Sequence, residues 1–303
     1  MSEPGAIRPL AAGDLSRIVE IDGATSGRPR KGFYQKRFAE LAADPAGSVA
    51  LAAERGGKVI GFAMAHLLDG EFGGSALVGV LDAVGVAQAS RGAGVATGLL
   101  AHLERELQRR GVQELRTQAD WTEHGLASFF SSSGFSLAPR LVLSRQVEEP
   151  TLEEFDWTDL PVRSMTEADL PSLVRIDKKH TGRDRSAYYR RKAHEALRQS
   201  GVRVSLVAEL EGQFAGFLMA RVDLGDFGRT EPTAVLDTIG VDPAFAGKQV
   251  GRALLEQLLN NLRSLRVERV LTEVEWDHFD LLRFLRRGGF KLSQRLTFQK
   301  KLA

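Results

Sequence analysis

The sequence repeats itself, and this feature constrains the fold more than any other. Residues of the same type recur 155 positions apart along the whole chain, without insertions between them. The recurring pairs include Asp14/Asp169, Asp22/Asp177, Asp82/Asp237, Gly85/Gly240, Gly92/Gly247, Trp121/Trp276 and Gly134/Gly289. A chain of 303 residues has room for two domains that each bury a core of their own. The sequence therefore predicts two copies of one domain, residues 1–149 and 150–303, which form a pseudo-dimer within one chain.

Composition excludes several classes of function. The 41 Lys and Arg residues nearly balance the 39 Asp and Glu residues, so charge gives no argument for nucleic acid or an anionic membrane as partner. The chain has no cysteine, which excludes disulfides, thiolate metal ligands and a cysteine nucleophile. We find no leader-like start and no run of about 18 apolar residues. We therefore expect a cytoplasmic protein with no nucleic-acid or membrane partner.

Apolar spacing predicts the same order of elements in both copies: strand, two helices, a hairpin, a strand, a helix, a strand, a helix and a final strand. This order is typical of a mixed α/β sheet. In the first copy the expected hairpin spans 49–54 and 59–66, a glycine-rich loop holds Gly70, Gly73 and Gly74, and a strand covers 76–86. The final strands are expected at 137–147 and 292–302, each completing its own copy. The acidic stretch 148–159 is the expected linker.

A strand, a glycine-rich turn and a helix follow one another at residues 84–107. Such a turn presents free backbone N–H groups and the positive end of a helix dipole to a phosphate. A Walker A loop is excluded because Gly-Lys-Ser/Thr is absent. A dinucleotide-binding fingerprint fits poorly, because Thr97 stands where the third glycine or alanine belongs and because several strands precede the segment.

The hexapeptide Arg91–Ala96, Arg-Gly-Ala-Gly-Val-Ala, resembles the Gln/Arg-x-x-Gly-x-Gly/Ala pyrophosphate loop of the GNAT superfamily of N-acetyltransferases. The resemblance covers both copies and includes the element order and the Gly-Phe pairs at 134–135 and 289–290. It implies two tandem domains, each with a mixed, mostly antiparallel sheet flanked by helices, and acetyl-CoA as cosubstrate. Main-chain contacts to pantetheine are implied for Val84, Gly85 and Val86, and the phosphate cradle for Arg91, Gly92, Ala93, Gly94, Val95 and Ala96.

The second copy departs from this pattern in its loop. Ala246 replaces the leading arginine, and Gln249 replaces the central glycine. A backbone that takes positive φ or approaches a phosphate closely tolerates glutamine poorly. We expect the N-terminal copy to bind acetyl-CoA and the C-terminal copy to bind it weakly or not at all, with Lys248 supplying partial compensation.

Acetyl transfer to an amine requires a base, because an ammonium group with a pKa near 10 must first lose a proton. Asp82, four residues before the end of the predicted coenzyme A strand, is the first candidate, and Glu123 is the second. Asp82 and Asp237 could equally be structural carboxylates within the sheet. The tyrosine that family members often use to protonate the leaving thiolate is replaced by Phe130 and Leu285. Ser131, Ser132 and Tyr34 are the remaining candidates for this acid.

The resemblance places the acceptor site at the two helices before the hairpin. Asp22, Arg28 and Tyr34 are therefore candidate substrate contacts, with an ion-pair clamp between Asp22 and Arg28 as the structural alternative. His66, His124, His180 and His278 do not stand at metal-ligand spacing, so we expect no metal. Trp121 and Trp276, at equivalent strand ends, are expected to serve packing.

These observations predict an N-acetyltransferase that moves the acetyl group of acetyl-CoA directly to a primary amine, either a small molecule or a peptide. The alternative is a non-catalytic protein that binds coenzyme A or regulates a partner, which the missing tyrosine makes plausible. The sequence does not identify the acceptor, and it leaves a homodimer open.

Overall fold

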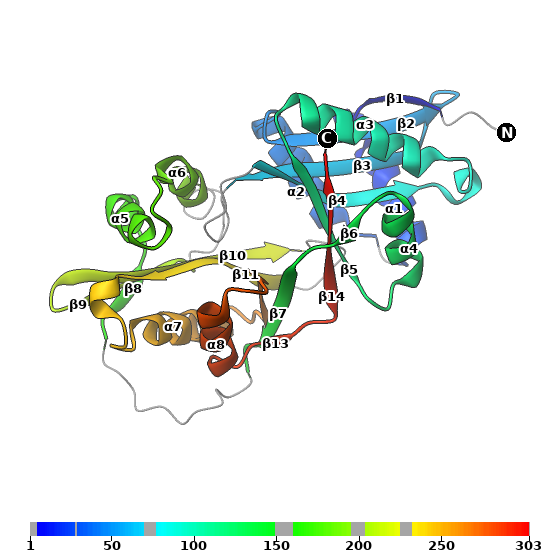
Figure 1. Ribbon diagram of the computed structural model, residues 1–303. Helices are drawn as coiled ribbons and strands as arrows, with labels where there is room; N and C mark the ends of the chain where they lie inside the picture. Colours follow the sequence, from blue (N-terminus) through cyan, green and yellow to red (C-terminus); the bar gives the residue numbers. More distant parts are fainter. Residues whose placement is uncertain are drawn as a thin grey trace.

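The computed structural model describes residues 5–27, 29–69, 77–148, 160–194, 204–224 and 232–302. These residues form two seven-stranded sheets (Figure 1). In sheet order, the strands of the first are β1 (Ala6–Pro9), β2 (Ser48–Arg55), β3 (Lys58–Asp69), β4 (Leu77–Val86), β5 (Glu114–Asp120), β14 (Arg295–Lys301) and β6 (Ser136–Leu137). Those of the second are β13 (Lys291–Leu292), β7 (Arg140–Gln146), β12 (Arg269–Glu275), β11 (Pro232–Val241), β10 (Gln213–Leu224), β9 (Leu206–Leu210) and β8 (Val162–Ser164). The predicted two-copy α/β architecture is confirmed.

Helices cover both faces of each sheet. The helices of the first copy are α1 (Leu15–Ser26), α2 (Lys31–Ala43), α3 (Val95–Arg109) and α4 (His124–Ser132). Their counterparts are α5 (Leu170–Thr181), α6 (Ser186–His194), α7 (Val250–Ser264) and α8 (Phe279–Arg287). The apolar stripe of α3 buries Leu99, Leu103 and Leu107 against one face of the first sheet. Ile18 of α1 and Tyr34 of α2 belong to a separate core on the other face.

Within each sheet one pair of neighbours, β4 with β5 and β11 with β12, is parallel, and the other pairs are antiparallel. The predicted hairpin is β2–β3, and the predicted strand 76–86 is β4. The loop with Gly70, Gly73 and Gly74 and the linker residues 149–159 lie outside the described residues.

The final strands are exchanged between the copies. All seven residues of β14, which belongs to the second copy in sequence, pair with β5 of the first, from Arg295↔Asp120 to Lys301↔Glu114. In the same way β7 pairs with β12, from Arg140↔Glu275 to Gln146↔Arg269. Figure 1 shows β14 entering the first sheet and β7 entering the second. The expectation that each final strand completes its own copy is therefore wrong. Two related sheets offer equivalent edges, and alternation along a strand does not say which of them it joins.

A contact between equivalent positions marks the pseudo-twofold axis between the copies. The side-chain amide of Gln118 donates to Glu273 Oε2 at 2.7 Å, and these two residues are 155 positions apart. Around this contact, Arg140 pairs with Glu275 at 2.7 Å, and Arg295 donates to the backbone oxygen of Gln118 at 3.3 Å. A residue touches its own counterpart only where the symmetry axis passes. The contacts between the copies are thus arranged as in the predicted pseudo-dimer.

The exchange makes the first core depend on a residue of the second copy. Phe298 of β14 is 6% exposed, and its ring centroid lies 5.5 Å from that of Phe130. We predict that Phe298→Ala lowers the free energy of unfolding by about 3–5 kcal/mol, because it leaves a cavity in a packed core. Urea denaturation followed by circular dichroism measures this loss.

Leu292→Ala is the control, since Leu292 lies in the same C-terminal segment but is 68% exposed. Its effect should stay within about 0.5 kcal/mol. Hydrogen exchange locates the damage: amides of β5, in the first sheet, should lose protection in Phe298→Ala. Faster exchange confined to the second sheet would contradict the exchanged arrangement.

Candidate functional site

Strands β4 and β5 separate after a short parallel contact. Their pairing comprises Val78↔Glu114, Gly79↔Leu115 and Val80↔Arg116, whereas β4 pairs with β3 as far as Val86↔Gly61. The hydroxyl of Thr117 donates to the Leu81 carbonyl at 3.0 Å where the strands part. The edge of β4 from Val84 to Val86 thus has no strand partner on the β5 side among the described residues. The second copy has the same arrangement, with three pairs between β11 and β12 and a Thr272–Leu236 hydrogen bond of 3.0 Å.

Asp82 lies in a β-bulge next to this separation. The register between β3 and β4 shifts so that Ala65 pairs with Leu81 and Met64 pairs with Ala83, which leaves Asp82 as the extra residue. In the second copy the same shift leaves Asp237 unpaired in the ladder. Bulges re-aim side chains and are frequent near active sites. The bulge places both carboxylates beside nitrogen-bearing side chains of the neighbouring helix and strand.

The Asp82 carboxylate is buried between two partners. Arg37 Nη2 of α2 lies 3.1 Å from Oδ1, and His66 Nδ1 of β3 lies 2.8 Å from Oδ2. The side chain of Asp82 is 3% exposed, and that of His66 is 22% exposed. The pairing of His66 with Asp82 could not be predicted, because nothing in the sequence shows that β3 brings this histidine beside the carboxylate.

Asp237 has partners at the equivalent positions of the second copy. Lys192 Nζ of α6 lies 3.8 Å from Asp237 Oδ1, and Arg221 Nε of β10 lies 3.3 Å from the same atom. A buried carboxylate flanked by one cationic side chain from a helix and one nitrogen-bearing side chain from a strand is therefore common to both copies, which favours a structural contribution. The difference lies at the strand position, where the first copy has an imidazole and the second a guanidinium.

Glu123 lies elsewhere, immediately before α4. It is exposed, and its Oε2 accepts a hydrogen bond of 3.1 Å from the backbone N–H of Asp120. Its counterpart in the second copy is His278. Glu123 is therefore open to solvent at the end of β5, whereas Asp82 is enclosed.

The glycine-rich loop has the same backbone conformation in both copies. Gly92 and Gly94 take φ of 75° and 74° before α3, and Gly247 and Gln249 take 77° and 64° before α7. A residue with a Cβ in this left-handed conformation costs about 1–2 kcal/mol. The second copy thus keeps the loop shape in spite of Gln249, and the difference between the loops lies in their side chains.

Side chains at the end of β4 and β11 distinguish the two sites. In the first copy Arg91 Nη2 donates to Thr25 Oγ1 at 2.9 Å and Nε donates to the Val86 carbonyl at 3.4 Å. In the second, His180 Nε2 lies 2.6 Å from the Val241 carbonyl oxygen. Lys179 Nζ also pairs with Asp242 at 2.6 Å, and this hydrogen bond lowers the pKa of Asp242. Two side chains of α5 thus bridge to the end of β11.

Helices α1 and α2 are joined by a buried clamp. Tyr34 Oη donates to Asp22 Oδ1 at 3.0 Å, and Arg30 Nε donates to Asp22 Oδ2 at 2.9 Å. Tyr34 is fully buried, and burial raises its pKa well above the usual value. Asp177, Arg185 and Tyr189 form the same clamp in the second copy.

The arginine of this clamp is Arg30, whereas Arg28, the expected partner, lies outside the described residues. Both arginines stand in the same loop, so spacing alone did not distinguish them. The substrate role of Asp22, Arg28 and Tyr34 stays a prediction, and the contacts of Asp22 and Tyr34 favour the clamp.

Comparison with known proteins identifies the family. The model of the Acetyltransferase (GNAT) family matches the chain twice, at residues 16–135 and 165–290, and so covers most of both copies. The chain belongs to the GNAT acetyltransferase family.

Solved GNAT structures share the two-copy fold. A GCN5-related N-acetyltransferase from Sphaerobacter thermophilus aligns with a TM-score of 0.66 and 16% identity, over 100% of this chain and 97% of its own. A tandem GNAT protein from the clavulanic acid biosynthesis pathway aligns with a TM-score of 0.68 and 15% identity, over 98% of each chain. A GCN5-related N-acetyltransferase from Kribbella flavida has a TM-score of 0.59 and 14% identity, over 98% of this chain and 71% of its own. At these identities the likeness shows the fold alone. No curated protein matches the sequence.

The position at which many GNAT proteins have a tyrosine lies in the core. Phe130 is 2% exposed and packs on Phe135, with ring centroids 5.4 Å apart. Of the two neighbouring hydroxyls, that of Ser132 donates to the Phe129 carbonyl at 2.9 Å, and Ser131 is exposed. The buried Tyr34 contacts Asp22 and Arg30, so the structure does not place it as a replacement acid.

The two equivalent tryptophans are not buried. Trp121 is 53% exposed and Trp276 is 54% exposed. They do not pack in a core, and their ring contacts are local: Trp121 lies near His124 and Trp276 meets Phe279 edge-on, with centroids 6.4 and 6.1 Å apart. Each follows its strand at the point where its backbone N–H donates across to the other copy, Trp121 to Gln294 and Trp276 to Pro139. This crossing holds the backbone in place while the rings stay partly exposed.

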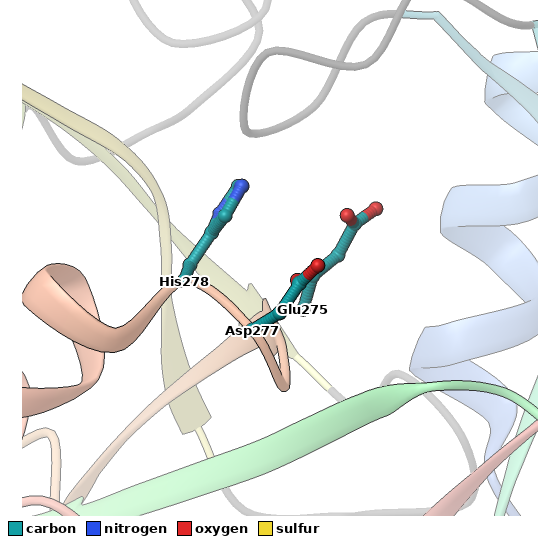
Figure 2. A group of neighbouring side chains, drawn as sticks. All are labelled: Glu275, Asp277 and His278. Atoms are coloured by element: carbon teal, nitrogen blue, oxygen red, sulfur yellow. The ribbon is translucent and has the colours of Figure 1, made fainter.

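Glu275, Asp277 and His278 form one group, in the described parts of the chain, whose side chains could hold a metal ion. Figure 2 shows the three side chains projecting to the same side of the turn after β12, and their ligand atoms lie within 4.8 Å of one another. Glu275 is already paired with Arg140, and the other two are exposed. Exposed groups of this kind are common without an ion, so the absence of a metal stays a prediction.

No helix in the described ranges is long and apolar enough to cross a membrane.

The conformation of Gln249 leads to a stability prediction. Replacing this residue by glycine removes the strain of a left-handed residue with a Cβ, at a position where the first copy has Gly94. We predict that Gln249→Gly raises the free energy of unfolding by about 1 kcal/mol in urea denaturation.

Gly94→Ala is the matched control and should lower the free energy of unfolding, since it introduces the strain that Gln249→Gly removes. Destabilisation by Gln249→Gly would show that the glutamine side chain makes a contact worth more than the strain.

Proposed function

We propose that the protein is an acetyl-CoA-dependent N-acetyltransferase, that its working site is in the N-terminal copy, and that a primary amine attacks the thioester directly. The observation that carries the proposal is the opening between β4 and β5, followed by the glycine loop at the start of α3. A Cβ added to Gly92 or Gly94 would meet nothing within 4 Å, so the described residues do not cover the loop at these two positions. Family membership supports the acyltransferase class, and the specific cosubstrate and acceptor belong to this proposal.

Each part of acetyl-CoA has a counterpart in the first copy. The free edge of Val84, Gly85 and Val86 offers main-chain hydrogen bonds to the amides of pantetheine. The N–H groups between Arg91 and Ala96, with the positive end of the α3 dipole, suit a pyrophosphate. Acetyl-CoA supplies an activated acyl group whose thiol, with an ordinary pKa near 8.5, leaves readily even without a dedicated acid.

The second copy has the fold without the full set of binding groups. Ala246 cannot contact a phosphate through a charge, and at the end of β11 the contacts come from Lys179 and His180 of α5, where the first copy has Arg91 beside Val86. We propose that this copy serves as a scaffold. The proton of the amine passes toward the Asp82 side of the site, with Glu123 as the second candidate base.

The second candidate function is a non-catalytic protein that binds coenzyme A. The burial of Phe130 favours it, because no tyrosine stands ready to protonate the thiolate. The two functions differ in one measurement. An enzyme releases free thiol from acetyl-CoA when pooled amines are added, whereas a binding protein does not.

The asymmetry between the loops predicts one tight acetyl-CoA site per chain. Isothermal titration calorimetry should give that stoichiometry. Arg91→Ala removes a charge-assisted contact and should weaken binding by about 1.5–3 kcal/mol, which is roughly 10- to 150-fold in Kd.

The matched control is Lys248→Ala in the second loop, which should leave the tight site unchanged. Two equivalent sites per chain would end the argument from asymmetry. Equal losses in the two variants would show that the phosphates are not bound at Arg91.

The equivalent carboxylates allow a test of catalysis. Asp82→Asn keeps the shape of the side chain and removes its charge, so the rate of acetyl transfer should fall by about 10²–10⁴ while acetyl-CoA affinity changes little. Asp237→Asn should leave the rate unchanged and at most reduce stability. Steady-state kinetics and thermal denaturation of both variants supply the comparison.

Two similar losses of stability with normal turnover would show that both carboxylates are only structural. Glu123→Gln would then be the next variant, because Glu123 is the second candidate base.

A further inference from the structure

The contacts of Asp82 point to His66, and not to Asp82 itself, as the group that accepts a proton from the amine. Both oxygens of Asp82 are engaged, one by Arg37 at 3.1 Å and the other by His66 at 2.8 Å. An enclosed carboxylate with two partners is poorly placed to take a proton from a substrate directly. His66, which is hydrogen-bonded to Asp82, has 22% of its side chain exposed, whereas Asp82 has 3%.

The hydrogen bond fixes which imidazole nitrogen can accept a proton. Since Nδ1 faces the carboxylate, it carries the hydrogen of the neutral ring, and Nε2 keeps its lone pair. Among the described residues, Nε2 has no hydrogen-bond partner. A carboxylate that orients an imidazole and stabilises the imidazolium is the arrangement of an Asp–His pair in acid–base catalysis.

His66 stands on the correct face of the sheet for this role. It follows Phe62 and Met64 at alternate positions of β3, and both of these belong to the core beneath α1 and α2. Its partner Asp82 lies two residues before Val84, where the free edge of β4 begins. The charged groups described around His66 are Asp82 on β4 and, on α2, Arg37 with its partner Glu40. Arg110 also lies nearby, because it donates to the carbonyl of Ser48, which pairs with His66 across the strands β2 and β3.

The second copy provides an independent observation. Arg221 stands at the position of His66 and donates to Asp237 at 3.3 Å. A guanidinium stays protonated at any physiological pH, so it cannot accept a proton. The copy with the altered loop is therefore also the copy without a proton acceptor beside its carboxylate, and the two changes occur on different elements.

We propose that Nε2 of His66 accepts the proton of the attacking ammonium group, and that Asp82, held by Arg37, is a positioning residue. The proposal rests on the function proposed above. One N–H bond of the ammonium breaks and its proton goes to Nε2. The amine lone pair forms the N–C bond, the C–S bond breaks, and its electrons go to sulfur. The second proton lost by nitrogen neutralises the thiolate, and the imidazolium releases its proton to solvent.

Two probe amines separate proton acceptance from folding and cosubstrate binding. Ethylamine is protonated at pH 7 as a lysine side chain is, whereas hydroxylamine is already neutral. His66→Asn keeps an amide donor near the position of Nδ1 and removes the accepting nitrogen. We expect kcat/KM with acetyl-CoA and ethylamine to fall about 10²-fold or more, with hydroxylamine turnover within about threefold of wild type. Acetyl-CoA affinity should not change.

The control is Arg221→Asn in the second copy, which should alter neither rate. His66→Gln is a second variant with the same expected result. For either variant, an equal loss of rate with both amines, or no loss of rate with ethylamine, would overturn the proposal. Absence of thiol release from wild-type protein with either amine, while acetyl-CoA still binds, would count against the proposed function and with it this inference.

A second measurement needs no acceptor. In protein labelled with ¹⁵N-histidine, the neutral ring of His66 should show the nitrogen shifts of the Nδ1–H tautomer, and Asp82→Asn should weaken this preference. A neutral ring protonated at Nε2 in the wild type would overturn the proposal, whatever the kinetics.

Discussion

The opening in the first sheet depends on β5 being held from its far side. β4 is fixed by β3 as far as Val86, and β5 is fixed along all seven residues by β14, which comes from the other copy. Because β4 pairs with β3 and β5 pairs with β14, the two strands can separate from each other while each keeps a full ladder of hydrogen bonds on its other edge. The second copy therefore contributes to the first site even where its own loop has changed. This gives a physical reason for the chain to keep both copies.

The two copies share their architecture and differ in chemistry. Both retain the clamp between the first two helices, the bulge that turns the carboxylate, and the left-handed loop. Among the positions that differ are two at the candidate site: Arg91 against Ala246 and His66 against Arg221. The shared features are those that set the backbone and the buried contacts of each copy, and the loop keeps its conformation even where Gln249 replaces the glycine.

The repeat, the element order and the loop could be predicted from the sequence, because spacing and glycine position record local conformation. The strand exchange could not, since two related sheets present equivalent edges to β7 and β14. The same limit explains Arg30 and His66. Arg28 and Arg30 stand in one loop and differ only in where their side chains reach, and His66 meets Asp82 through a sheet register that involves a bulge. The exposure of Trp121 was missed because a strand-end tryptophan looks the same whether it is covered or not.

The contact between Gln118 and Glu273 on the pseudo-twofold axis has a consequence for assembly. If two C-terminal halves paired with each other, the axis would bring two glutamate carboxylates together, and like charges in direct contact repel. In the fused chain the glutamate meets an amide that donates to it. The contact thus favours an N-terminal half beside a C-terminal half over two C-terminal halves side by side. The charge difference at this position therefore disfavours an assembly in which two C-terminal halves meet, and it leaves each C-terminal half to pair with an N-terminal half.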